Sequence, residues 1–299
     1  DARSVARRLG IPHYVFNFKD DFREKVIKKF ASGYLRGQTP NPCIDCNRYM
    51  KFDKLLERAK LLGCDKLATG HYARIEFDGE KYRLKKALDK SKDQSYVLYM
   101  LTQEQLAHTL FPLGSLHKTD TRAIADAADL SSARKPDSQD ICFVPDGDYA
   151  AAIERLTGEK APCGDFIDAS GKILGTHRGI THYTVGQHRG LGLSLPERRY
   201  VCGIDAESGT VTIGGSDELY SSTAEVRDFN WISGEAPSEP IRCTAKIRYR
   251  QPEQPATAIA RSDGSVTLHF DAPQRAVTPG QAAVLYDGDT VLGGGEIVR

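Results

Sequence analysis

Two cysteines that stand three residues apart, Cys43 and Cys46, form the first group with reactive potential. Prolines at positions 40 and 42 stiffen the chain around them, so the thiols lie on a defined turn. Cys46 lies near the N-terminus of a predicted helix, where the helix dipole and free backbone N–H groups favour the thiolate, the form that attacks disulfide and persulfide sulfur. The spacing also fits half of a zinc site, a thioredoxin-like redox pair or two buried cysteines. Zinc needs four ligands, and the sequence holds no second Cys-x-x-Cys pair.

A third thiol, Cys142, lies between Ile141 and Phe143 in a segment that is otherwise charged. If the fold brings Arg134 and Lys135 close to it, their positive charge lowers the pKa of this thiol and favours its reactive form. A cysteine between two apolar residues is more commonly a core residue. From the residues alone, both interpretations stay open.

Two short polar segments could contact a nucleotide or a nucleic acid. Gly70 and His71 follow a predicted strand at residues 66–69, and ligands bind beyond the carboxyl ends of strands in open α/β sheets. Gly70 allows a close backbone approach, while His71 either hydrogen-bonds a ligand or caps the strand. In residues 91–95, Lys92 opens a predicted helix, which favours either an anion site or simple helix capping.

Two further segments combine basic residues with glycine or aromatic residues. Residues 175–190 suit backbone contacts with phosphates, or form a compact structural turn. In residues 246–250, a strand would present Lys246, Arg248 and Arg250 on one face, while Tyr249 stacks on a base or packs below. Such alternation is also ordinary for a half-exposed strand.

The first half of the chain alternates between helix and strand, which predicts a doubly wound parallel sheet in an α/β domain. The expected order is a helix that ends at Gly10, strand 11–16, helix 22–34, helix 52–62 and strand 66–69. A hairpin with its turn at Asp78-Gly79 and helices at 95–101 and 121–128 follow.

The last 80 or so residues predict only strands, in a small closed β-barrel. Expected strands are 241–249, 257–261, 265–270, 282–286 and 291–292, with hairpin turns at Asp263-Gly264 and Asp287-Gly288. Together with a change of texture near residue 147, this pattern predicts domains at residues 1–146, 147–216 and 217–299.

Composition is that of a globular protein, and the charge is unevenly distributed along the chain. Hydrophobic residues make up 40% and charged residues 27% of the 299 residues, and no apolar run approaches the roughly 20 residues of a membrane span. Residues 1–99 carry 22 Lys and Arg against 13 Asp and Glu, whereas the remainder carries 19 against 27. The basic first third favours an RNA or nucleotide partner, although uneven surface charge alone would also produce it. Seven irregularly spaced cysteines and no signal peptide predict a cytoplasmic protein with reduced thiols.

Taken together, several segments resemble those of the tRNA-specific 2-thiouridylase family. They are residues 39–47, 68–74, 92–95, 138–143, 181–192, 246–250 and 278–281, in the family's order across nearly the whole chain. The resemblance implies an ATP-pyrophosphatase domain (adenine nucleotide alpha hydrolase-like), a small central domain and a C-terminal β-barrel that contacts tRNA. It also implies ATP-dependent adenylation of the C2 oxygen of the wobble uridine at position 34, followed by persulfide sulfur transfer that gives 2-thiouridine.

The resemblance carries roles to individual residues. Cys142 matches the cysteine that holds the persulfide, and Cys46 matches the nucleophile that closes a disulfide with it as sulfur leaves. Gly70 would contact ATP, accompanied by Mg²⁺, and the protein itself would hold no metal. The tRNA contacts would be Asn41, Pro42 and Cys43 at the target base, with His71, Lys92, Asp93, Gln94, Arg248, Tyr249 and Gln281. The implied partners are the tRNAs for Lys, Glu and Gln and a persulfide donor, either a cysteine desulfurase or a relay protein.

Two departures from the family pattern bear on this prediction. The chain opens at Asp1 without a Met, and no Ser-Gly-Gly-Val-Asp-Ser-type phosphate loop stands in it, so we expect an N-terminal truncation. Cys43 stands where some members carry an Asp considered an acid or base, which leaves open which thiol pairs with Cys142. Two alternative functions are a non-catalytic tRNA-binding protein of the same fold and another ATP-pyrophosphatase that activates a small acid or amide, which would not need both Cys46 and Cys142.

Overall fold

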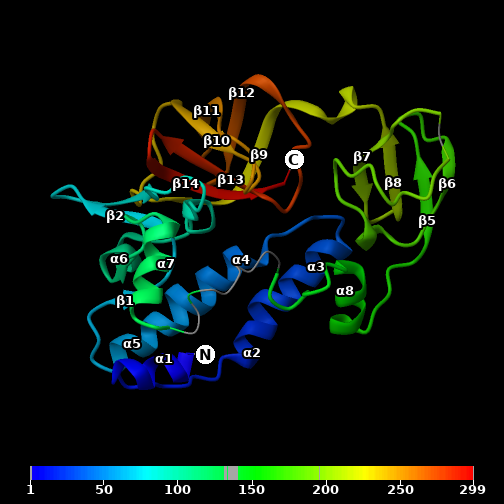
Figure 1. Ribbon diagram of the computed structural model, residues 1–299. Coiled ribbons are helices and arrows are strands. Elements are labelled where there is room, and N and C mark those ends of the chain that lie inside the picture. Colours follow the sequence, from blue (N-terminus) through cyan, green and yellow to red (C-terminus); the bar gives the residue numbers. More distant parts are fainter. Residues whose placement is uncertain (1, 131–132, 134–140, 195, 299) are drawn as a thin grey trace.

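The computed structural model describes residues 2–130, 133, 141–194 and 196–298. An α-helical part, a small four-stranded sheet and a β-barrel make up the fold (Figure 1). The barrel lies above the helices in this view, and the four-stranded sheet stands to one side of both. No helix in the described ranges is long and apolar enough to cross a membrane.

The N-terminal part is built around two long helices and a short parallel sheet. The first helix runs through α2 (Lys19–Phe22), η1 (Arg23–Ile27) and α3 (Lys28–Leu35). The second runs through α4 (Pro42–Asp45), η2 (Cys46–Leu55) and α5 (Leu56–Leu61), and η2 is π-helical. Around them lie α1 (Ala2–Leu9), β1 (Leu67–Ala68), β2 (Ala73–Phe77), β3 (Tyr82–Lys86), η3 (Ser95–Val97), α6 (Gln103–Ala107), β4 (Thr109–Leu110) and α7 (Lys118–Ala127). Strands β1 and β4 pair in parallel, which confirms the α/β class.

Two expected elements of this part are wrong. Residues 11–16 form no strand, and the side chains of Ile11, Tyr14 and Val15 are exposed. An extended segment becomes a strand only where its backbone groups find a partner, and none of the described strands pairs with it.

Residues 95–101 are not a helix but a 3₁₀ turn followed by irregular chain. Side chains from distant parts of the sequence donate hydrogen bonds to backbone carbonyls that a helix would use for its own hydrogen bonds. Asn230 Nδ2 donates to the carbonyls of Tyr99 and Leu101 at 2.7 and 3.0 Å, and Asn47 Nδ2 donates to that of Val97 at 2.8 Å. All seven residues are buried. Burial on every side means that the spacing of the apolar residues cannot distinguish a helix from irregular chain.

The central part follows with α8 (Tyr149–Thr157), β5 (Gly164–Ile167), β6 (Ile173–His177), η4 (Ile180–His182), β7 (Tyr200–Asp205), β8 (Thr210–Gly214) and η5 (Asp217–Leu219). Its strands are ordered β6-β5-β8-β7 around a core that includes Phe166 and Tyr183. His177 is a structural residue here, because its ring nitrogens contact the backbone of Gly179 and Gly209 at 3.0 Å each.

The C-terminal strands close into a barrel, as the sequence predicted. Their order is β13-β10-β11-β12-β9-β14, and β13 also pairs with β14. The bounds are β9 (Tyr220–Trp231), β10 (Ile241–Lys246), β11 (Gln254–Ala260), β12 (Val266–Arg275), β13 (Ala282–Asp287) and β14 (Thr290–Ile297). Strand β9 was missed, and β10 ends at Lys246 rather than Tyr249 because the chain turns there.

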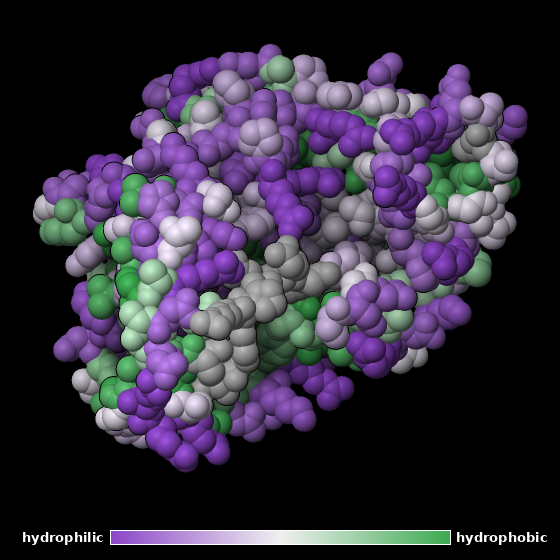
Figure 2. Space-filling model, in the orientation of Figure 1, coloured by the Kyte–Doolittle hydropathy of each residue, from purple (hydrophilic) through white to green (hydrophobic). Residues whose placement is uncertain are grey.

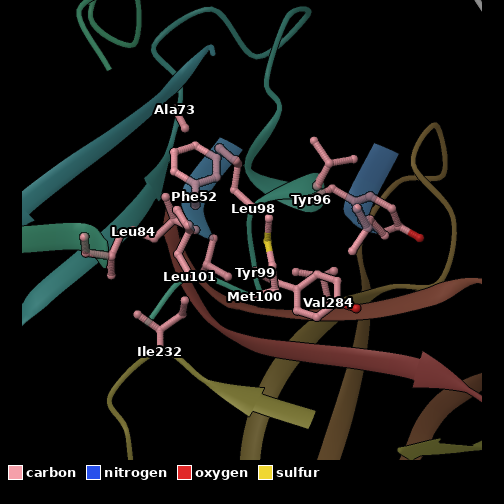
Figure 3. Close-up of a cluster of buried hydrophobic side chains, with 14 of the residues drawn as sticks. Phe52, Ala73, Leu84, Tyr96, Leu98, Tyr99, Met100, Leu101, Ile232 and Val284 are labelled. Carbon is pink, nitrogen blue, oxygen red and sulfur yellow. The ribbon is translucent and has the colours of Figure 1, made fainter. Parts of the chain in front are cut away.

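The helical part and the barrel share one hydrophobic core, shown in Figure 3. Phe52 and Leu98 from the helical part lie with Val284 of β13 and Ile232, which follows β9. The β2–β3 hairpin also joins the barrel sheet through the pair Lys85 and Thr290. Because this core crosses the expected domain boundary, the barrel fixes the position of the helix that carries Cys46.

Candidate active site

The cysteine pair stands in the first turns of the second long helix, not ahead of it. Asn41 is the N-cap, since its side chain accepts a hydrogen bond from Cys43 N at 3.1 Å. Pro42 occupies the first helical position, where a missing N–H costs nothing. The Asn-Pro-Cys sequence is therefore a helix start whose geometry fixes both thiols. The side chain of Cys43 is exposed and that of Cys46 is partly buried.

The barrel holds the chain just ahead of this helix start. Thr39 N donates to Pro279 O at 2.9 Å, and Gln281 Nε2 donates to Thr39 O at 2.5 Å. Gly280 has φ +87°, and a Cβ there would lie 2.8 Å from Thr39 N. Residues 38–40 therefore pack directly on the backbone between β12 and β13.

Partly buried ion pairs attach the same helix to its surroundings. Asp45 is 5% exposed and pairs with Lys29 of α3 at 2.8 Å, while Glu296 of β14 lies 4.0 Å from Lys29. Burial raises the pKa of the Asp45 carboxyl, and Lys29 opposes that rise. One turn on, Arg48 pairs with Asp228 of β9. These contacts join the cysteine helix to both α3 and the barrel.

Burial and neighbouring groups shift the pKa of both cysteines in the pair. Burial raises the pKa of Cys46, with Cys142 and Asp45 adding to the rise and Lys51 opposing it. At Cys43, whose side chain is exposed at the groove, the surrounding protein atoms still desolvate the thiol and raise its pKa, and the nearby Cys46 and Cys142 add to that rise. The helix N-terminus was expected to favour the Cys46 thiolate, whereas burial acts against that thiolate. Cys142 contributes at both Cys43 and Cys46, which indicates that the fold places the three thiols in one neighbourhood.

Cys142 itself is exposed, so the core interpretation of this thiol is wrong. Its neighbour Phe143 is partly buried and packs edge-on against Phe30 and Phe22 of the first long helix, which anchors the segment. Arg134 and Lys135, the cations expected beside Cys142, lie outside the described residues.

A groove of about 1070 Å³ opens beside Cys43. Several predicted site residues line it together, although they come from separate segments: Asn41, Cys43, Gly70, Lys92, Asp93, Gln94 and Tyr249. Further lining residues are basic or aromatic: Tyr72, Lys90, Lys118, Tyr149, Lys246 and Arg250. Such a combination of cations and rings suits a polyanion with stacked bases. On the face shown in Figure 2, hydrophilic residues cover most of the barrel surface.

The groove wall at residues 92–94 is a fixed backbone turn rather than a helix start. Asp93 accepts hydrogen bonds from Ala87 N at 2.9 Å and from Ser95 Oγ at 2.7 Å. Gln94 Oε1 accepts from Tyr72 N at 3.0 Å, and Tyr249 donates its hydroxyl to Asp93 O at 3.2 Å. Asp93 and Gln94 therefore shape the wall in this structure, and their tRNA contacts stay predictions.

Three predicted tRNA-contacting residues do not line the groove: His71, Arg248 and Gln281. Other protein groups contact each of them. His71 is 7% exposed, and burial lowers its pKa to about 4. Arg248 Nη2 donates to Val185 O at 2.9 Å and to Thr278 Oγ1 at 2.6 Å. Their contacts with tRNA also stay predictions.

Two lysines of this site were not among the predicted site residues. Lys51, on the cysteine helix, lowers the pKa of Cys43 and Cys46. Lys246, at the end of β10, lies 5.9 Å from the ring centres of both Tyr96 and Tyr249, and burial lowers its pKa. The segment 246–250 did indicate Lys246, but nothing in the spacing of Lys51 marks it.

Comparison with known proteins identifies the parts of the fold. Residues 1–146 match the tRNA methyl transferase HUP domain, residues 152–215 the tRNA methyl transferase PRC-barrel domain, and residues 221–297 the aminomethyltransferase beta-barrel domain. A HUP domain followed by these two β domains, with paired thiols beside a basic groove, defines a class of tRNA-modifying enzymes.

Curated relatives narrow that class. The tRNA-specific 2-thiouridylase MnmA of Acetivibrio thermocellus is 53% identical over 99% of this chain and 83% of its own length. Relatives with the same name from Thermoanaerobacter sp. and Clostridioides difficile are 51% and 46% identical, each over 100% of this chain and 83% of the relative. The chain belongs to the tRNA-specific 2-thiouridylase family.

Proposed function

We propose that this protein is a tRNA-uridine 2-sulfurtransferase that makes 2-thiouridine at position 34 in an ATP-dependent reaction. The observation that carries the proposal is that Cys142, which is distant from Cys46 in the sequence, lies close enough to raise the pKa of Cys46, while Ile141 and Cys43, close to these two thiols in the sequence, line the basic groove. A persulfide on one thiol needs a second thiol within reach to release its sulfur.

The sulfur step follows from this pairing. The outer sulfur of a Cys142 persulfide attacks C2 of the uridine, and the activated oxygen leaves. Cys46 then attacks the Cys142 sulfur, so that the old sulfur–sulfur bond breaks with its electron pair on the sulfur now bound to C2. The products are a thiocarbonyl on tRNA and a Cys46–Cys142 disulfide, which an external thiol reduces for the next turnover.

ATP fits the carboxyl end of β1. Gly70 is exposed there beside the groove, and a Cβ at this position would meet only Leu113, at 3.8 Å. When bound, ATP supplies the adenylate that makes the C2 oxygen a leaving group. Mg²⁺ would come with the phosphates of ATP, since it binds through phosphate oxygens and few protein ligands.

The tRNA would lie along the groove with its target base at Asn41, Pro42 and Cys43. Lys92, Asp93, Gln94 and Tyr249 line the same groove, while His71, Arg248 and Gln281 would reach tRNA only at its margins. The tRNAs for Lys, Glu and Gln, a cysteine desulfurase or relay protein as persulfide donor, and a cytoplasmic location belong to the same proposal. So do the domain boundaries at 146 and 216.

The test is mass spectrometry of nucleosides from tRNA incubated with the full-length protein, ATP and a persulfide donor. Cys142→Ser and Cys46→Ser are expected to abolish 2-thiouridine, while Cys163→Ser, a change at an exposed thiol of the central part, leaves it unchanged. If tRNA binds but wild-type protein forms no 2-thiouridine, the proposal fails and a non-catalytic tRNA-binding role replaces it.

A further inference from the structure

We propose that Lys51 is a positioning residue whose ammonium group faces Cys46 and stabilises its thiolate for attack. The inference deepens the proposed function and rests on Cys46 acting as a nucleophile. Lys51 acts through its charge on the Cys46 sulfur.

Helix geometry places Lys51 on the face of Cys46. Cys46–Leu55 is π-helical, and in a π-helix each N–H bonds the carbonyl five residues back. Residues 46 and 51 therefore stand nearly one above the other. In an α-helix the same two side chains would point about 140° apart. Wide winding thus places the side chains of Lys51 and Cys46 on the same side of the helix.

A buried histidine holds the ammonium group from its other side. Lys51 Nζ lies 3.4 Å from His71 Nε2, and His71 Nδ1 lies 2.8 Å from Thr69 Oγ1. The rings of Phe52 and Phe111 pack on the imidazole, with centroids 5.8 Å away in each case. Because burial keeps this imidazole neutral, it accepts a hydrogen bond from Lys51 without cancelling the positive charge.

The other charged groups around Cys46 do not supply this stabilisation. Cys142 and Asp45 both disfavour its thiolate, and Cys43, three residues back on the same helix, is a further thiol close to it. Neighbouring cations are engaged elsewhere, since Lys29 pairs with Asp45 and Arg48 with Asp228. Within the described ranges, no carboxylate lies at ion-pair distance from Lys51.

Lys51 favours the thiolate of both cysteines. Cys46 stands one π-helical turn from Lys51, whereas Cys43 stands three residues further back along the chain, so we expect the larger effect at Cys46. The two thiols therefore provide an internal comparison within one protein.

The experiment measures iodoacetamide alkylation across a pH series, with Cys43 and Cys46 separated by fragment-ion mass spectrometry. Lys51→Met should move the alkylation midpoint of Cys46 to higher pH and slow its reaction about threefold to tenfold near neutral pH, with a smaller change at Cys43. Lys51→Arg should restore the wild-type profile. Lys51→Gln keeps a hydrogen-bond donor toward His71 and removes the charge, so it replaces Lys51→Met if that variant does not fold.

Lys54→Met is the matched control, because Lys54 lies on the same helix and faces Asp21 at 3.9 Å. The proposal is overturned if the Cys46 midpoint stays unchanged without the Lys51 charge, or if Lys54→Met moves it equally. The measurement needs neither tRNA nor ATP. A failure here is therefore distinct from a failure of the nucleoside assay, which tests the enzyme's function.

Discussion

Replacing Gly280 with alanine should weaken the packing between the barrel and the chain that leads into the cysteine helix. Gly280 has φ +87°, a conformation that L residues avoid, and its missing side chain lets the backbone of residues 38–40 pack against it. A Cβ would lie 2.8 Å from Thr39 N and 3.0 Å from the Cβ of Gln38. Neither contact is the mobile end of a side chain, so the loop itself must shift.

The expected loss of folding free energy in Gly280→Ala has two parts. The left-handed backbone alone costs about 1–2 kcal/mol for alanine. Forcing an extra methyl group into a packed site costs about 1–3 kcal/mol more. Gly234→Ala isolates the first part, because Gly234 has φ +85° and open space around its absent Cβ.

Calorimetry of the full-length variants measures the difference. We expect Gly280→Ala to melt at least about 3 °C below Gly234→Ala, from the second part alone. Thiolation should fall as well, since the hydrogen bonds from Thr39 N to Pro279 O and from Gln281 to Thr39 O hold the residues ahead of Asn41. Equal melting temperatures for the two variants would refute the close packing on which this reasoning depends.

Two further predictions separate structural from binding roles. Arg248→Ala should cost about 2–4 kcal/mol of stability, because it leaves buried hydrogen-bond partners unsatisfied. Arg250→Ala should leave the melting temperature unchanged and weaken tRNA binding. It should also reduce the slope of log binding constant against log salt concentration by about 1. Equal effects of both variants on stability would contradict this division. His71 should make the fold sensitive to acid. Between pH 6.5 and about 4 the unfolded chain binds a proton at His71 that the folded chain excludes. The free energy of unfolding therefore decreases as the pH is lowered, by up to about 3 kcal/mol. Urea unfolding across this range should show a weaker pH dependence for His71→Phe, and an unchanged dependence would count against a buried neutral imidazole.

The sequence predicted most of the fold where one physical signal was strong. Two-residue Asp-Gly turns located the hairpins at residues 78–79, 263–264 and 287–288, and apolar stripes located both long helices. Prediction failed where the tertiary structure decides. Residues 95–101 are irregular because Asn230 and Asn47, both distant in sequence, take their carbonyls.

The site was predicted in its parts but not in its assembly. Motif order indicated Cys46, Cys142, Gly70 and the segment around Lys92. Spacing along the chain could not show that Asn41 caps the cysteine helix, nor that burial raises the pKa of Cys46. The position of Lys51 depends on π-helical winding and on a buried His71, neither of which leaves a local pattern in the sequence.

The central claim is that Cys46 and Cys142 work as a pair, and peptide mapping after a single turnover tests it most directly. Full-length protein carrying a persulfide on Cys142 is mixed with tRNA and ATP without reductant, and its disulfides are then identified by mass spectrometry. The account predicts a Cys46–Cys142 disulfide that accumulates in step with 2-thiouridine. Formation of 2-thiouridine with Cys142 joined to Cys43 instead, or with no disulfide at all, would contradict it.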